Sequence, residues 1–181
     1  PLGYMQALAQ KYDSFGILQI DAHADLRQAY EGFEFSHASI MFNALKMTQL
    51  TSLVQVGVRD ICKEEIDLIQ ADKRIRTYFD VKLHQERFRG VSVSEQWDSI
   101  IKDLPEQVYV SFDIDGLDPK LCPNTGTPVP GGLQYAEVVE LFRRLKESGK
   151  QIIGCDLNEV GNQEWDANVG ARILYELSCI L

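Results

Sequence analysis

The chain has 181 residues, 45% of them hydrophobic and 25% charged, which is typical of one globular domain and excludes a disordered segment. Its net charge of -9 and sequence pI near 4.8 argue against a nucleic-acid groove and an anionic membrane surface, but suit a cationic ligand. No apolar run is long enough to cross a bilayer. The four cysteines are widely spaced and form no Cys-x-x-Cys pair, so we expect a reduced, cytoplasmic setting.

Short apolar runs alternate with longer amphipathic stretches along the chain. Strands are predicted at residues 15–20, 53–58, 75–79, 108–114 and 151–157. Helices are predicted at residues 2–11, 37–47, 63–72, 94–102, 135–148 and from 165 to the C-terminus. This alternation predicts an α/β fold of three layers, α/β/α, with a mainly parallel sheet. Ligand sites of such sheets lie beyond the carboxyl ends of the strands, so the residues that follow each strand are the first candidates.

Two carboxylates and an imidazole follow the first predicted strand. Asp21, His23 and Asp25 alternate with two alanines, and in extended backbone these three side chains point the same way. Burying them together is costly unless a cation is present. The alternative is a solvated acidic turn that contains a histidine by chance.

A second acidic motif ends the fourth predicted strand. Asp113 and Asp115 share one face of the segment, and an aspartate such as Asp113 fits poorly inside an apolar strand. The alternative is an exposed strand end followed by a turn, which is a sufficient explanation for Asp118 because that residue precedes a proline. Together the two motifs predict a binuclear metal site. Its oxygen-rich donors favour Mn²⁺, with Zn²⁺ or Mg²⁺ as alternatives.

Three segments resemble signatures of the ureohydrolase family of arginase, agmatinase and formimidoylglutamase. Residues 17–25 resemble its apolar strand followed by D-A-H-x-D, and residues 111–132 resemble S-F-D-I-D-G-L-D-P with the later T-G-T-P and G-G. Residues 154–160 resemble its late G-x-D-x-x-E-V. The likeness extends over essentially the whole chain in the right order. Asn124 departs from it, because the family usually has a small residue there, and we expect only a local effect on the loop.

The resemblance implies two sets of metal ligands. Asp21, Asp25 and Asp113 would bind one ion, while Asp21, His23, Asp113 and Asp115 would bind the other, with Asp21 and Asp113 shared. Two Mn²⁺ ions are implied for the complete enzyme. A family Gly-Gly-Asp-His segment, whose histidine is a further ligand, would precede Pro1. We therefore expect residues 1–181 to form a single ureohydrolase-type domain, N-terminally incomplete, that binds one ion tightly or none.

Two further roles come only from the resemblance. His37 would protonate the leaving amine, although on its own it is better explained as a solvent-facing residue at a helix start. Glu159 would hold the substrate guanidinium, and its alternative is an ordinary loop acid. His84 matches no family motif and is expected to be a surface histidine.

The implied reaction is the hydrolysis of a guanidino compound, with agmatine, giving putrescine and urea, ranked first. Residues 26–35 should shape the pocket rim, where Glu31 or Glu34 could receive a distal ammonium. Arg27 could instead receive a carboxylate, or simply pair with Glu31 on the surface. Guanidinobutyrase or formimidoylglutamase activity ranks second and arginase activity third. The resemblance also implies a homo-oligomer, and the alternative class is a catalytically impaired domain that acts through association.

Overall fold

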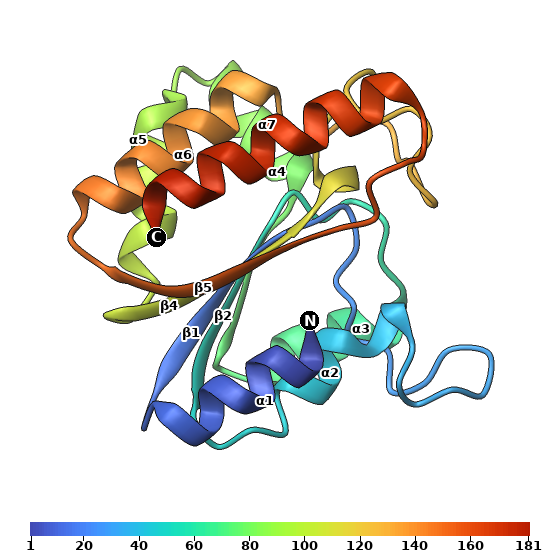
Figure 1. Cartoon of the computed structure of the whole chain (residues 1–181), viewed down its shortest axis with the longest axis vertical. Helices are drawn as coiled ribbons and strands as arrows, with labels where there is room; N and C mark the ends of the chain where they lie inside the picture. The colour runs from blue at the N-terminus through green and yellow to red at the C-terminus, as the bar shows by residue number, and fades with distance from the viewer.

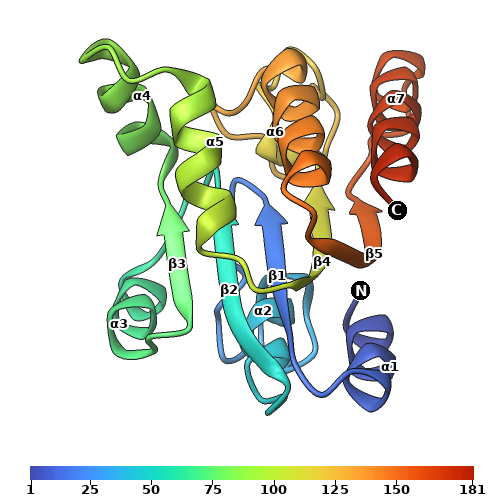
Figure 2. The ribbon, with the colours of Figure 1, turned by 90° about the vertical axis from the view of Figure 1, so that its left-hand side faces the viewer.

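A computed structural model of the protein describes all residues from 1 to 181. Its centre is a five-stranded sheet in the order β3-β2-β1-β4-β5, in which every neighbouring pair is parallel. The strands are β1 (Phe15–Ile20), β2 (Leu50–Val56), β3 (Ile75–Tyr78), β4 (Gln107–Asp113) and β5 (Gln151–Asn158). Figure 2 shows that all five arrows point the same way, so their carboxyl ends meet at one edge.

Helices cover both faces of this sheet (Figure 1). One face is covered by α1 (Leu2–Lys11), α2 (Ile40–Ala44) and α3 (Lys63–Ala71). The other is covered by α4 (Asp80–Phe88), α5 (Val93–Lys102), α6 (Tyr135–Glu147) and α7 (Glu164–Ile180). The predicted three-layer α/β/α architecture is therefore confirmed. None of these helices combines the length and the apolar character that crossing a bilayer requires.

Alternation along the central strands produces the two apolar layers. Phe15 and Ile17 of β1 pack with the α1–α2 side, whereas Leu18 and Ile20 belong to the larger cluster with α5, α6 and α7. All six residues of β1 are buried, as expected for a parallel strand covered on both faces.

The structure differs from the sequence prediction in two helices. The helix predicted at residues 37–47 is a short 3₁₀ helix, His37–Ser39, followed by α2. The carbonyl of Asp25 accepts the N–H groups of Met41 and Phe42 and so ties the start of α2 to the first acidic motif. The helix α4 was not predicted, because Leu83 is its one buried apolar residue and a single apolar position gives no helical stripe.

Candidate metal centre

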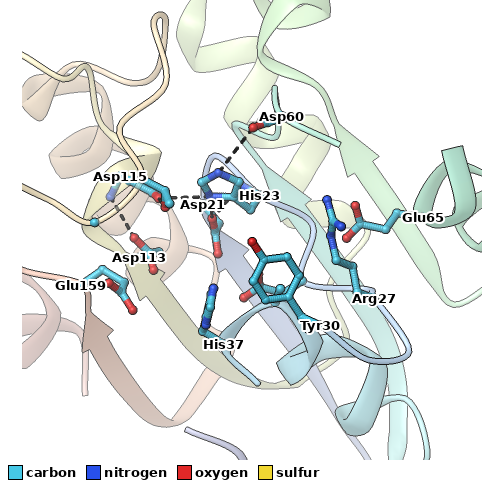
Figure 3. A pocket seen from close by; sticks show the side chains of 14 residues that line it. Asp21, His23, Arg27, Tyr30, His37, Asp60, Glu65, Asp113, Asp115 and Glu159 are labelled. Atoms are coloured by element: carbon cyan, nitrogen blue, oxygen red, sulfur yellow. Dashed lines mark hydrogen bonds and ion pairs between the residues drawn. The ribbon is translucent and has the colours of Figure 1, made fainter. Parts of the chain in front are cut away.

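One cavity at the carboxyl edge, with a volume of ≈ 370 Å³, brings together all seven residues predicted to act in metal binding or catalysis. They are Asp21, His23, Asp25, His37, Asp113, Asp115 and Glu159. In Figure 3, Glu159 and Asp113 lie on one side of the cavity and Tyr30 and Arg27 on the other, with His37 between them. The segments that supply these side chains are far apart in the sequence, so the sheet is what assembles the site.

Strand register places the two acidic motifs beside each other. Ile20 of β1 pairs with Phe112 of β4, so the next residues, Asp21 and Asp113, emerge from adjacent strands at the same level. The backbone N–H of Ala22 then donates to Oδ1 of Asp115 at 3.0 Å. This bond joins the two motifs directly.

Backbone and side-chain donors fix the orientation of Asp21. Its Oδ1 accepts the N–H of His23 at 2.7 Å, and its Oδ2 accepts the side-chain amide of Gln19 at 2.9 Å. Asp25, four residues on, has a φ of 55°, a left-handed conformation that aspartate tolerates better than most residues. The chain thus turns sharply after the first motif instead of continuing as a strand.

Asp115 lies in a short 3₁₀ turn that follows β4. Its N–H donates to Oδ1 of Asp113 at 2.9 Å, and its Oδ2 accepts the hydroxyl of Thr127 at 3.2 Å. The Nδ1 atom of His23 is 3.1 Å from the same Oδ2. Asp115 is therefore almost fully buried and contacts both halves of the site.

Ligand-type atoms of Asp21, His23 and Asp115 all lie within 4.8 Å of one another, a spacing that suits a single cation. Asp113 and Asp25 line the same cavity but stand outside this group. The donor set of four carboxylates and one imidazole is the chemistry that hard and borderline divalent ions prefer. The residues present therefore fit a divalent metal.

Burial and crowding of like charges dominate the electrostatics of the site. Burial raises the pKa of Asp21 to about 6 and, together with neighbouring carboxylates, that of Asp113 to about 10. Burial and the charge of Asp21 also raise the pKa of Asp25 well above its usual range. Burial alone would raise the pKa of Asp115, but hydrogen bonds from His23 and a backbone N–H lower it. The contact with Asp115 in turn raises the pKa of His23 to about 10.

His37 begins the 3₁₀ helix and lines the cavity without contacting the acidic group. Its ring meets the edge of the Tyr30 ring, with the centroids 5.3 Å apart. Glu159 follows β5 with a φ of 59°, and its carbonyl accepts the Thr125 hydroxyl at 2.9 Å. A Cβ added at Gly126 would lie 3.2 Å from Glu159 Oε2, so this glycine leaves room for the carboxylate.

Sequence analysis missed Arg59, which anchors the loop carrying Asp115. The guanidinium donates to the carbonyls of Gly57 at 3.0 Å, Asp115 at 2.7 Å, Leu117 at 3.1 Å and Val129 at 3.0 Å. We call residues 114–134 the anchored loop. The position of Arg59 just after the carboxyl end of β2 was the one sign in the sequence that it could belong to the site. No pattern in the sequence shows that one arginine will bind four carbonyls.

Asp60 and Glu65 were not predicted to belong to the site, yet both line the cavity. Tyr30, from the predicted rim segment, and Thr127, from the T-G-T-P motif, line it as well. Glu65 is buried and accepts the N–H groups of Leu26 and Cys62, each at 3.0 Å, which fixes the chain just after Asp25.

Two other residues named from the sequence lie away from the acidic group. Asn124, the departure from the family pattern, donates its N–H and its side-chain amide to the buried Asp166, each at 2.8 Å, so its effect is a local loop contact. His84 lies on α4, with Nδ1 3.0 Å from the Asp80 carbonyl, and does not line the cavity.

Comparison with protein families matches residues 1–179 to the arginase family. The chain is 35% identical to the N(1)-aminopropylagmatine ureohydrolase of Thermus thermophilus over 173 residues, covering 94% of this chain and 55% of the relative. It is 31% identical to the guanidinobutyrase of Pseudomonas aeruginosa, covering 99% and 57%, and 30% identical to the agmatinase of Bacillus subtilis, covering 96% and 57%. The chain spans about half the length of these curated relatives.

Solved structures agree with this assignment. A putative agmatinase from Clostridium difficile has a TM-score of 0.81 at 27% identity, covering 99% of this chain and 62% of that one. A hypothetical agmatinase from Burkholderia thailandensis has a TM-score of 0.80 at 28% identity, covering 97% and 54%. The arrangement of helices and strands therefore follows a fold that is known from experiment.

Proposed function

The chain belongs to the arginase family, and we propose that the protein is a metal-dependent ureohydrolase that hydrolyses a guanidino compound to urea and an amine. The observation that carries the proposal is one cavity that holds the five candidate metal ligands together with the carboxylate of Glu159. A cationic guanidino substrate matches this excess of negative charge.

We propose that the carboxylates and the imidazole of this cavity would hold two divalent ions, with Mn²⁺ ranked first. Asp21, His23 and Asp115, with Asp113, would hold one ion. Asp25, with Asp21 and Asp113, would contribute to the other. When bound, such ions supply an activated water and offset charge in the transition state.

Glu159 is suited to bind the planar guanidinium. Its carboxylate borders the cavity beside Gly126, and the bond from Thr125 holds its backbone in position. A charge-assisted hydrogen bond from the substrate would orient the central carbon toward the acidic group. Because the side chain reaches in from β5, it can bind the guanidinium without taking a place among the metal ligands.

His37 is suited to deliver a proton to the departing amine. It lies on the cavity wall but outside the group of Asp21, His23 and Asp115, so a bound metal would leave its imidazole free. An imidazole can hold a proton on one ring nitrogen and release it to a leaving group, which is the role of a general acid.

Agmatine is the substrate we rank first, because relatives named for agmatine and aminopropylagmatine act on a guanidinium with a cationic tail. Guanidinobutyrate is the second candidate, since Arg27 lines the cavity and could receive a carboxylate, and one relative is a guanidinobutyrase. Formimidoylglutamate shares that carboxylate, and arginine ranks last.

A screen for urea release from agmatine, guanidinobutyrate and arginine, and for formamide release from formimidoylglutamate, tests the proposal. In the presence of Mn²⁺ the protein should bind one ion tightly and act best on agmatine. His37→Ala should keep its metal and turn over about 100-fold more slowly. Glu159→Gln should keep its metal and bind the substrate about tenfold more weakly.

His84→Ala and Glu164→Gln are the matched controls, since both residues lie outside the cavity, and both should behave as the parent. A protein that holds Mn²⁺ but hydrolyses none of the four compounds would favour the alternative of a non-catalytic interaction domain.

A further inference from the structure

One level below the acidic edge, a polar row crosses the whole sheet on the face covered by α1, α2 and α3. Each strand contributes one residue in register: Thr77, Gln55, Gln19, Ser111 and Asp156. Two residues earlier in the same strands, the positions are apolar: Ile75, Leu53, Ile17 and Tyr109. The change from apolar to polar therefore occurs at a single level, directly beneath the candidate metal ligands.

Three members of the row form a chain of hydrogen bonds that ends on a candidate ligand. The Thr77 hydroxyl donates to Gln55 Oε1 at 2.7 Å, and Gln55 Nε2 donates to Gln19 Oε1 at 2.7 Å. Gln19 Nε2 then donates to Asp21 Oδ2 at 2.9 Å. The chain runs from the edge strand β3 through β2 and β1 into the cavity.

Backbone carbonyls fix the direction of this chain. Gln55 Nε2 also donates to the Ala24 carbonyl at 2.7 Å, and Gln19 Nε2 to the His23 carbonyl at 3.3 Å. A carbonyl can only accept, so flipping either amide would set two oxygens against each other. Both glutamines must therefore present their N–H groups toward the acidic motif, and Gln55 Oε1 is left to accept from Thr77.

Folding alone does not account for these side chains. Gln19 and Gln55 are 1% and 0% exposed, and they adjoin an apolar layer. Buried amides cost free energy unless every hydrogen bond is made, and apolar residues would fill the same level without that requirement. All four side-chain N–H groups are used: Gln19 donates to Asp21 and the His23 carbonyl, and Gln55 donates to Gln19 and the Ala24 carbonyl.

We propose that Gln19 is a positioning residue that orients the Asp21 carboxylate for a divalent cation, and that Gln55 and Thr77 hold Gln19 in place. The proposal rests on the proposed function, since it assumes that Asp21 binds a metal. Gln19 controls one oxygen of Asp21 while the His23 N–H controls the other, so both oxygens have a fixed direction before a metal arrives. Such orientation lowers the cost of ordering a ligand at the moment of binding.

We call the chain of hydrogen bonds from Thr77 to Asp21 the relay. Calorimetric titration with Mn²⁺ alone tests the relay at Thr77, the member farthest from Asp21. Thr77→Val removes only the hydroxyl and should weaken Mn²⁺ binding about threefold, whereas Thr77→Ser keeps the donor and should bind as the parent. Gln19→Met should weaken binding about tenfold. Thr51→Val, which removes a hydroxyl bond to the Phe15 carbonyl at the other end of β2, should leave the affinity unchanged. Equal affinities for Thr77→Val and the parent would overturn the proposal.

A second measurement on the metal-free chain separates the relay from the proposed function. The His23 N–H donates to Asp21, so its hydrogen exchange reports how firmly that carboxylate is held. Exchange should be several-fold faster in Gln19→Met and in Thr77→Val, and unchanged in Thr51→Val. If the parent binds no Mn²⁺, the proposed function fails, but faster exchange in these variants still supports the relay. Unchanged exchange in both overturns it.

Discussion

The anchored loop, residues 114–134, and the rim loop, residues 26–36, border the same cavity but are held in very different ways. Several side chains bind the anchored loop from outside. Arg59 donates to three of its carbonyls, Asp80 accepts the Gly132 N–H at 3.2 Å, and the buried Asp166 accepts two N–H groups of Asn124. Its Gly132 has a φ of 92°, and an added Cβ would lie 2.5 Å from the Leu117 carbonyl. The loop has almost no room to adopt another path.

The rim loop is bound near its ends, where Glu65 accepts the Leu26 N–H and Asn43 donates to the Glu34 carbonyl, but its tip is hydrogen-bonded only to itself. Tyr30 and Phe33 exchange two backbone hydrogen bonds across a turn in which Glu31 and Gly32 both have positive φ. The side chains of Phe33 and Phe35 are 69% and 75% exposed, and Figure 1 shows the loop projecting away from the body of the molecule. One loop thus fixes a candidate metal ligand, while the other presents exposed side chains at the rim, a division that would let substrate preference change without disturbing the metal site.

The largest effect should come from releasing the anchored loop. Arg59→Met would leave several buried carbonyls without a charged donor, and the free energy of unfolding should fall by about 3 kcal/mol or more. Mn²⁺ binding should also be lost, because Asp115 would no longer be held beside His23. Urea denaturation and metal titration measure the two quantities.

The control for this change is Arg143→Met on α6, which removes an exposed arginine that pairs only with Glu140 and Glu147. Both its stability and its metal affinity should stay close to those of the parent. If Arg59→Met were equally mild, the anchored loop would be held by its own backbone and the contrast between the loops would disappear.

Asp113→Asn should have a smaller effect: it should raise the stability of the metal-free protein but weaken Mn²⁺ binding. Burial and neighbouring carboxylates raise the pKa of Asp113 to about 10. The folded state therefore holds a proton that the unfolded state releases near pH 4, and metal-free stability should fall as pH rises from about 4 toward 10. Asparagine is neutral, so the variant should melt a few degrees higher than the parent at pH 8 without metal.

The same variant should lose tight Mn²⁺ binding, because the amide is a weaker ligand than a carboxylate. Thermal melting with and without Mn²⁺ checks both signs, and Asp98→Asn on the exposed side of α5 is the control. A metal-free variant less stable than the parent at pH 8 would show that the carboxylate is stabilised by contacts other than metal.

Much of this arrangement could be predicted from the sequence because its signals are local. The apolar runs of β1 and β4 identified the central strands, and the aspartates directly after them identified the carboxyl edge. The contacts that orient those aspartates join distant residues, as the bond from Ala22 to Asp115 shows with a separation of 93 positions. The roles of Gln19 and Gln55 could not be predicted for a related reason. The role of a polar residue inside an apolar strand depends on its partners across the sheet, which the sequence does not show.

The smallest effect should come from the rim loop and should change only substrate preference. Arg27 lines the cavity, and its guanidinium lies over the Tyr30 ring, 5.3 Å from the centroid, without an ion pair to Glu31 or any other acid. Arg27→Gln should therefore leave stability and metal content unchanged. It should raise the affinity for agmatine and lower that for guanidinobutyrate, since a unit charge a few ångströms away in water is worth about 1 kcal/mol, or roughly fivefold. Competitive binding of the two compounds to the Mn²⁺-loaded protein measures the ratio, with Arg172→Gln on α7 as the control. A changed metal content would mean that the rim loop also supports the ligands, and an unchanged ratio would mean that the tail of the substrate is bound elsewhere.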